Sequence, residues 1–270
     1  MDVEERCEAA SALGQLGRAE EKMLDSLLIL ASDTQVNAKV RREAASTLGN
    51  LGRVAEAAKV LLILASDTQI NAEVRYEAAS ALGQLSNAEE ARNIMLTLAQ
   101  DEQVDTEVRS DAINSLSVLL NIQGCADEKV LDSLLSLARD EQVNVRVRGA
   151  AASAMGHLGR VREAVEILLF LAHDEQVDAE VHNDTADALS YLGRIKEAVD
   201  VWLALACDRQ VDARIQRTAA QTLGQLGRDN ERVLNGLLAL ARDTQVDAEV
   251  RDDAYNSLKL LVGGATANSE

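Results

Sequence analysis

Apolar residues recur at helical spacing along residues 38–51, where Val40, Ala44 and Leu48 fall on one face of a helix. Arg42 and Asn50 fall on the opposite face, which leaves one stripe apolar and one polar. The pattern predicts an amphipathic helix that buries its apolar stripe and exposes its polar one.

A second kind of apolar segment precedes each such helix, as in AEAAKVLLILA at 55–65 and EAVEILLFLA at 163–172. Two helices of about 12 residues, joined by a short connection, form an antiparallel hairpin that cannot bury its own apolar face. We therefore expect neighbouring hairpins to stack, and each to shield the next.

The turn between the two helices repeats a D-x-Q-[V/I] motif, and its copies lie 34, 34, 39, 34, 34 and 35 residues apart. A leucine or methionine follows each aspartate fifteen residues later, so the changes in length all fall in the other connection. A fixed period of this kind indicates a repeat architecture. The seven motif aspartates are Asp33, Asp67, Asp101, Asp140, Asp174, Asp208 and Asp243.

The ends of the second helix carry local signals. Asn37 and the equivalent aspartates are residue types whose side-chain oxygen caps a helix N-terminus, and glycine after the last leucine suits a left-handed C-terminal residue. The longer connection at 117–133 predicts a helix extended by about a turn and ended by Gly124. The aspartate caps are Asp105, Asp178, Asp212 and Asp247, and the glycines are Gly17, Gly52, Gly159, Gly193 and Gly227.

Composition supports an all-α fold, since aromatic residues make up only 2% of the chain and proline is absent. The core must therefore be aliphatic. Trp202 stands where the other repeats have leucine or methionine, so we interpret it as a packing residue.

The order Asp67, Val74-Arg75, Ala78-Ala79 and Ala81-Leu82-Gly83 resembles HEAT repeats, and among them the short bacterial kind related to bilin lyases. The tetratricopeptide repeat shares the 34-residue period, but only nine residues separate Leu48 from Ala57, and its proline and aromatic signature is missing.

The resemblance implies a right-handed α-solenoid of stacked antiparallel helix pairs over residues 1–262, made of a half repeat plus seven pairs, with a disordered tail at 263–270. It also implies that the second helices line the concave side. Finally, it implies a ladder between each turn aspartate and the Val-Arg arginine, as in Asp67 and Arg75, which His182 and Gln216 interrupt.

The formal net charge of −18 argues against nucleic-acid binding and against an anionic membrane surface. Three widely separated cysteines, Cys7, Cys125 and Cys207, indicate neither a disulfide framework nor a cysteine-rich metal site. Reduced thiols and the absence of a secretory signal in the given chain lead us to expect a cytoplasmic protein.

Catalytic chemistry has little support in the sequence. The three histidines, His157, His173 and His182, do not form the His-Glu pairs on which the HEAT-like deoxyhypusine hydroxylases depend for iron. No phosphate-binding loop or nucleophile elbow appears. We therefore expect no enzyme, with no catalytic residue, no cofactor and no metal site.

The polar face of the second helices varies between otherwise similar repeats, as expected for partner-specific contacts or for unconstrained drift at a solvated surface. Tyrosine and arginine favour contact hot spots, which singles out Tyr76, Tyr191, Arg42 and Arg217. The complete set of predicted partner-binding residues is Arg42, Ser46, Tyr76, Ser80, Ser110, Asn114, Asn183, Asp187, Tyr191, Arg217 and Gln221.

The first helices offer a rival face, on which Ile29, Ile63 and Phe170 occupy one repeated position. The acidic residues gathered at the turns have two interpretations. They cap helices and aid solubility, or they steer a basic partner toward the chain.

Two functions remain. The first is a non-catalytic scaffold or ligand-sensing array that binds a protein or peptide, with a basic partner as one option. The alternative is a bilin-lyase-like protein that assists chromophore attachment. The opening helix lacks a preceding partner helix, so we also expect end-to-end self-association or membership of a longer chain, with an engineered array as a third option.

Overall fold

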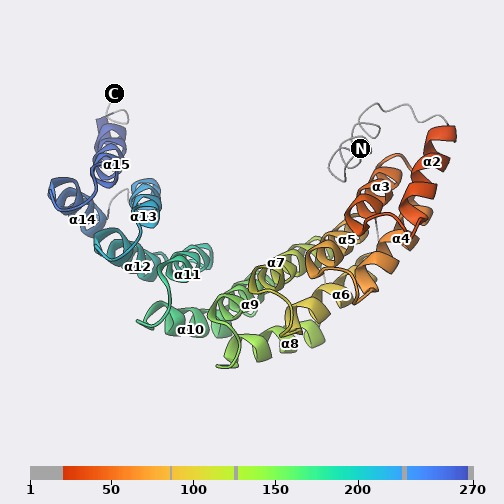
Figure 1. Ribbon diagram of the computed structural model, residues 1–270. Coiled ribbons are helices and arrows are strands. Elements are labelled where there is room, and N and C mark those ends of the chain that lie inside the picture. The colour runs from red at the N-terminus through yellow and green to blue at the C-terminus, as the bar shows by residue number, and fades with distance from the viewer. Residues whose placement is uncertain (1–20, 86, 125–126, 227–229, 267–270) are drawn as a thin grey trace. The chain divides into compact units, whose positions relative to one another are not determined.

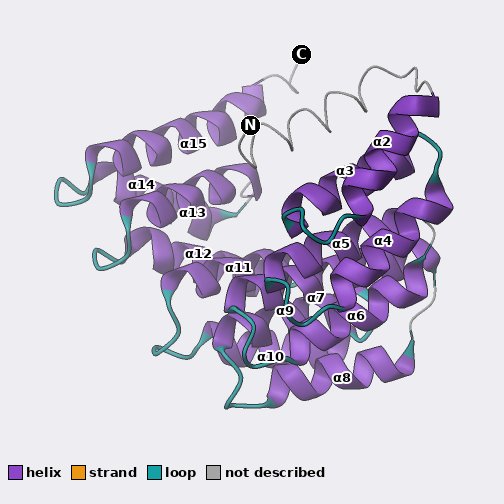
Figure 2. Ribbon diagram, turned by 45° about the vertical axis from the view of Figure 1, so that its right-hand side comes forward, coloured by secondary structure: helices purple, strands orange, loops and turns teal. Residues whose placement is uncertain are grey.

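The computed structural model describes residues 21–85, 87–124, 127–226 and 230–266. This part of the chain contains fourteen helices and no strand, and the helices follow one another as seven pairs. Short loops join them (Figure 2). The predicted leading half repeat around Leu13 lies outside the described residues. The chain divides into two compact units, residues 1–133 and residues 134–270.

From α2 to α7, each helix contacts the next one in the chain, and helices of the same kind in successive pairs contact each other. The first helices α2, α4 and α6 form one layer and the second helices α3, α5 and α7 form the other (Figure 1). This arrangement is the predicted stack of hairpins. The bounds are α2 (Glu21–Ser32), α3 (Ala38–Asn50), α4 (Val54–Ser66), α5 (Ala72–Gln84), α6 (Ala88–Gln100) and α7 (Thr106–Gln123).

The second unit repeats the same scheme, in which α9, α11, α13 and α15 are the second helices and successive second helices contact one another. Both units are therefore all-α stacks of helix pairs, as predicted. The bounds are α9 (Val145–His157), α10 (Val161–Ala172), α11 (Ala179–Tyr191), α12 (Ile195–Cys207), α13 (Ala213–Leu226), α14 (Glu231–Arg242) and α15 (Ala248–Thr266), while α8 (Glu128–Arg139) contains the division between the units.

The local signals at the helix ends are confirmed wherever they fall on described residues. The side chain of Asn37 accepts a hydrogen bond from the backbone N–H of Lys39 at 2.9 Å, and Asp105 accepts one from Glu107 at 2.9 Å. Gly52 has a φ of 94°, a backbone conformation that side chains with a Cβ rarely adopt. Gly17 and Gly227 lie outside the described residues.

Helix α7 has 18 residues and ends at Gly124, whose φ of 63° is left-handed, as the longer connection predicted. The last helix, α15, continues to Thr266, past residue 262, where the repeat pattern predicted the solenoid to end. Within the described residues, no helix combines the length and the apolar character needed to cross a membrane.

The core of both units is aliphatic. Leu64 and Leu98 at the ends of first helices and Leu48 and Leu82 in second helices are fully buried. Burying a leucine side chain contributes about 1.5–3 kcal/mol relative to leaving it exposed. Trp202 is also fully buried, which confirms its interpretation as a packing residue.

The predicted Asp-Arg ladder is wrong. The Nε of Arg41 donates a hydrogen bond to the backbone carbonyl of Ala31 at 3.0 Å, and Arg109 does the same to Ala99 at 3.0 Å. Each turn carboxylate instead accepts the backbone N–H two residues later, as Asp33 does from Gln35 at 2.9 Å. The acceptor of the arginine is thus a backbone carbonyl at the buried end of the preceding helix.

The arginine therefore clamps the two helices of one pair to each other and does not link successive repeats. At the two positions without arginine, His182 and Gln216 approach the carbonyl oxygens of Asp174 and Asp208 through their Nε2 atoms, at 3.1 and 2.6 Å. These two shorter side chains make an equivalent contact. Their acceptor lies two residues later in the repeat than the carbonyl to which the arginines donate.

Candidate partner-binding site

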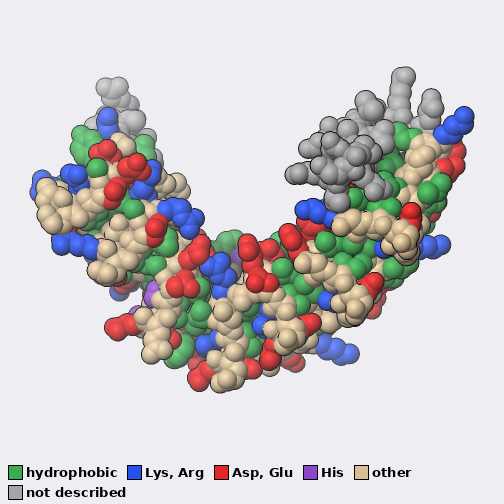
Figure 3. Space-filling model, viewed as in Figure 1, with side chains coloured by type: hydrophobic (Ala, Val, Ile, Leu, Met, Phe, Trp, Pro, Cys, Tyr) green, Lys and Arg blue, Asp and Glu red, His purple; other side chains and the backbone are tan. Residues whose placement is uncertain are grey.

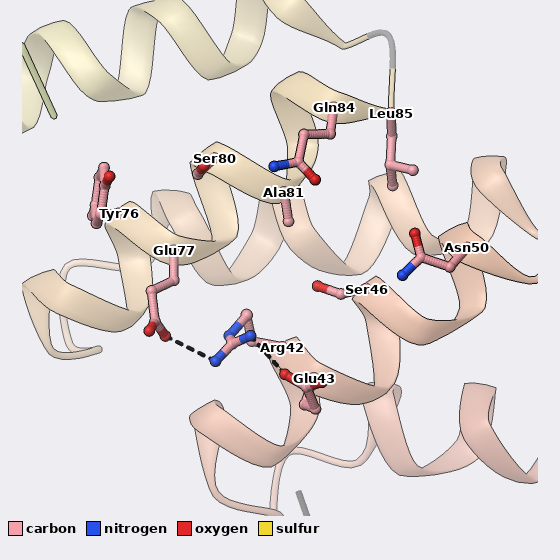
Figure 4. Close-up of a pocket in the computed structure, with 10 residues that line it drawn as sticks. All are labelled: Arg42, Glu43, Ser46, Asn50, Tyr76, Glu77, Ser80, Ala81, Gln84 and Leu85. Atoms are coloured by element: carbon pink, nitrogen blue, oxygen red, sulfur yellow. Dashed lines mark hydrogen bonds and ion pairs between the residues drawn. The ribbon is translucent and has the colours of Figure 1, made fainter. Parts of the chain in front are cut away.

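A cavity of about 310 Å³ opens between the second helices α3 and α5 of the first unit. Four predicted site residues line it, namely Arg42 and Ser46 from α3 and Tyr76 and Ser80 from α5 (Figure 4). We call this cavity the α3–α5 groove. Its full lining is Arg42, Glu43, Ser46, Asn50, Tyr76, Glu77, Ser80, Ala81, Gln84 and Leu85.

One end of the groove is charged. Arg42 lies 2.7 Å from a carboxylate oxygen of Glu43 and 3.0 Å from one of Glu77, so it ties α3 to α5. The arginine is thus held by the protein itself and is not a free cation for a partner. Two carboxylates face one guanidinium, which leaves this end with one negative charge in excess.

The other end of the groove is polar without charge. Asn50 and Gln84 are exposed, and their amide groups lie at the same end of the cavity (Figure 4). Between the two ends, the Ser46 hydroxyl oxygen is buried and has no hydrogen-bond partner in the described part of the chain. Amides and hydroxyls both donate and accept hydrogen bonds, so this end suits a ligand that carries both kinds of group.

The remaining predicted residues of the first unit differ in how open they are. The Tyr76 hydroxyl shares a hydrogen bond of 2.9 Å with Ser115 Oγ on α7, so it is engaged between repeats. Asn114 is exposed. Ser110 is only 8% exposed, so its predicted place on the open surface is wrong; its small side chain ends below the packed surface around it.

In the second unit, Arg217 is also engaged within the chain. Its Nε donates to Asp253 Oδ2 on α15 at 2.7 Å, and its Nη1 forms an ion pair with Glu249. Gln221, one turn further along α13, is exposed. The two arginines selected from the sequence therefore link neighbouring second helices.

Helix α11 carries the other predicted residues of the second unit. Tyr191 is 68% exposed, and its ring lies nearly perpendicular to that of His157 on α9, with 4.3 Å between the ring centroids. One turn earlier, Asp187 accepts a hydrogen bond of 3.3 Å from the Asn183 side-chain amide. Burial lowers the pKa of His157, which favours the neutral imidazole.

The carboxyl groups of α11 are unequally compensated. Glu180 is within 2.5 Å of Arg146 and 3.3 Å of Arg214, and the hydrogen bond from Arg146 is the main cause that lowers its pKa. Partial burial raises the pKa of Asp187, and the charge of Asp184 raises it further. Partial burial also raises the pKa of Asp184, against the opposing effect of Arg146.

A raised carboxyl pKa means that the ionised side chain costs stability at neutral pH. We expect Asp187→Asn to raise the free energy of unfolding at pH 7, by less than about 1 kcal/mol because Asp187 stays in contact with water. The gain should shrink as the pH falls through the raised folded-state pKa, because the wild-type carboxyl then becomes protonated. Urea unfolding at several pH values, followed by circular dichroism, measures this.

Asp243 is the matched control, because the backbone N–H of Gln245 and the side chain of Arg209 lower its pKa. Asp243→Asn should therefore lose stability at neutral pH, and the loss should vanish at acid pH. A gain of stability in both variants would show that overall net charge, and not the local environment of Asp187, determines the sign of the change in the free energy of unfolding.

Charge does not separate into large patches on the surface seen in Figure 3. Asp and Glu side chains lie interspersed with Lys and Arg on that face.

Within the described residues, no group of three or more His, Cys, Asp or Glu side chains is placed to hold a metal ion. On the rival face of first helices, Ile29 and Ile63 in the first unit and Phe170 in the second are all more than half exposed.

Sequence reasoning missed part of the groove. Glu43 and Glu77 each follow a predicted site residue directly, at the same position of successive repeats, and that repetition was the available signal. Asn50 and Gln84 continue the polar face by one helical turn. The structure brings all four together with the four predicted residues of the groove, whereas the remaining predicted residues lie elsewhere on the second helices.

One of the comparisons with known proteins, that with family models, agrees with the repeat pattern. A family model of HEAT repeats matches residues 34–117 and again residues 71–146. No curated protein matches the chain. Among solved structures, human deoxyhypusine hydroxylase in complex with glycerol is 22% identical, with a TM-score of 0.38, and the match covers 97% of this chain and 92% of that one. A computationally designed self-assembling cyclic homooligomer is 18% identical, with a TM-score of 0.16, and the match covers 99% and 86% of the two chains.

Proposed function

We propose that this chain, part of which matches HEAT repeats, is a non-catalytic scaffold that binds a protein or peptide through its second helices. The observation that carries the proposal is the α3–α5 groove, a cavity whose lining includes four of the residues selected from the sequence. A ligand pocket of about 300 Å³ or more is large enough for a small group or a short segment of chain.

The size of the groove favours an extended peptide segment. Residues 42 and 50 are eight residues apart on one helix, or about 12 Å at 1.5 Å per residue. An extended chain advances about 3.3 Å per residue, so the groove matches three to four residues of peptide. A peptide backbone alternates N–H and C=O groups, and the exposed amides of Asn50 and Gln84 can bond to both.

The charged end favours a basic partner. The negative charge left over around Arg42 attracts a Lys or Arg side chain and repels an acidic one. The overall charge of −18 acts in the same direction at long range, and more strongly at low salt.

The test uses a displayed library of short random peptides selected on the purified full chain. We expect the enriched peptides to contain basic residues and to bind Asn50→Ala/Gln84→Ala about tenfold or more weakly, since each lost hydrogen bond costs about 0.5–1.5 kcal/mol. Both side chains are exposed, so the thermal unfolding of this variant should match that of the wild type.

Asn93→Ala/Gln100→Ala is the control, because it removes the same two residue types from exposed positions on the first helix α6. This control should leave peptide affinity unchanged. Weaker binding by the control alone would move the binding face to the first helices, and a selection that enriches no peptide would contradict the proposal. The chromophore-attachment alternative stays a prediction, and a bound tetrapyrrole absorbance band in the purified protein tests it.

A further inference from the structure

The second unit carries an aromatic and acidic pair that is separate from the α3–α5 groove. Asp187 and Tyr191 are four residues apart on α11, so their side chains lie on the same face about one helical turn apart. Both are exposed, and 68% of Tyr191 is accessible to solvent. The two side chains therefore present one open surface made of a ring and a carboxylate.

The ring of Tyr191 packs against an imidazole ring of the neighbouring second helix. His157 on α9 meets it at an angle of 82° with 4.3 Å between centroids. This contact limits the rotamers of the tyrosine while most of its surface stays open, so little conformational entropy is lost when a second group stacks on it.

The carboxylate of Asp187 lacks a cationic partner within the described residues. Its hydrogen-bond donor is the neutral amide of Asn183, at 3.3 Å, whereas Glu180 on the same helix is paired with Arg146 and Arg214. The neighbouring charge of Asp184 is of the same sign and raises the pKa of Asp187. A cation supplied from outside the chain would relieve both effects.

We propose that Tyr191 and Asp187 together bind an arginine side chain of a partner protein or peptide. A guanidinium group is planar, stacks on an aromatic face and donates two parallel hydrogen bonds to one carboxylate. An ammonium group can make the ion pair but cannot stack in the same way, so arginine is favoured over lysine.

The rest of the second unit offers a natural comparison. Tyr255 on α15 is 61% exposed, but the residue four positions before it is Arg251, which disfavours a second guanidinium. An exposed tyrosine alone is thus not sufficient, and Tyr255 is a matched control for Tyr191.

The experiment titrates the isotope-labelled full chain with acetyl-Gly-Arg-Gly-amide and follows backbone and Tyr ring resonances by NMR. We expect the largest shifts at Asp187 and Tyr191. The peptide with lysine in place of arginine should bind about threefold more weakly. The peptide with citrulline in place of arginine is uncharged there and should give no saturable shift. Tyr191→Ala and Asp187→Asn should each weaken binding about fivefold or more, and Tyr255→Ala should leave it unchanged.

Three results would overturn the inference. The citrulline peptide could bind as tightly as the arginine peptide, or Tyr191→Ala and Tyr255→Ala could lose the same affinity. The shifts could also be spread evenly over the exposed Asp and Glu residues. In the Asn50→Ala/Gln84→Ala variant, the shifts at Asp187 and Tyr191 should follow the same titration curve as in the wild type, because its substitutions lie in the other unit. Failure of the groove and failure of this arginine site are therefore separate results.

Discussion

Trp202→Ala is expected to lower the free energy of unfolding of the second unit by about 3–5 kcal/mol. Trp202 lies on α12, is fully buried and is the largest side chain in the core. Truncation removes its buried apolar area and leaves a cavity that the neighbouring helices can close only in part. In a stack of repeats the loss should spread to adjacent pairs, since each pair is stabilised by its neighbours.

Trp202→Phe separates packing from hydrogen bonding. The indole Nε1 is buried and has no hydrogen-bond partner in the described part of the chain, so replacing it with a carbon ring removes an unsatisfied donor. We expect this variant to lose far less stability than Trp202→Ala.

Urea unfolding by circular dichroism, with hydrogen exchange to locate the change in α11, α12 and α13, measures both tryptophan variants. Phe170→Ala is the control, because Phe170 is an aromatic residue of the same unit that is 57% exposed. An unfolding midpoint of Trp202→Ala close to that of Phe170→Ala would contradict the packing role.

The repeat period and the helix ends could be predicted from sequence because they depend on local chemistry. Asn37 caps its helix through a backbone group two residues away, and Gly52 adopts its left-handed conformation within one turn. Neither depends on how repeats meet. The buried position of Trp202 followed from the period, because other repeats have aliphatic residues there.

Choices between competing partners could not be predicted. From the sequence, Arg41 could pair either with the carboxylate of Asp33 or with a backbone carbonyl. In the structure it donates to the carbonyl of Ala31. Arg42 looks like a free surface cation, yet it pairs with Glu77, which lies 35 residues along the chain. Ser110 occupies the same place in its repeat as Arg42 but is buried, because side-chain size and packing differ between repeats.

The variable positions of the second helices therefore serve two purposes. Arg42 with Glu77 and Arg217 with Asp253 join neighbouring repeats, so their variation follows intramolecular pairing. Gln84 and Tyr191 remain available to a ligand, the first as an exposed amide in the groove and the second as an exposed ring. Variation alone does not distinguish these purposes, whereas the contacts do.

Arg75→Ala is expected to lower the free energy of unfolding of the first unit by about 2–3 kcal/mol. Arg75 is 8% exposed and donates through Nε to the carbonyl of Ala65 at 3.3 Å, so it joins α4 to α5 within one pair. A hydrogen bond from a charged donor contributes about 1.5–3 kcal/mol. The buried stem adds packing that alanine loses, while removal of a buried charge offsets part of the cost.

Arg75→Gln is the informative companion, because Gln216 fills the equivalent position in a later repeat and donates to the carbonyl of Asp208 at 2.6 Å. If the clamp needs only a donor that reaches a turn carbonyl, glutamine should recover at least half of the stability lost in Arg75→Ala. Lys59→Ala, at an exposed position on α4, should change stability by no more than about 0.5 kcal/mol. Hydrogen exchange should show faster opening of α4 and α5 in Arg75→Ala. Exchange unchanged from that of Lys59→Ala would mean that the hairpin is held by apolar packing alone.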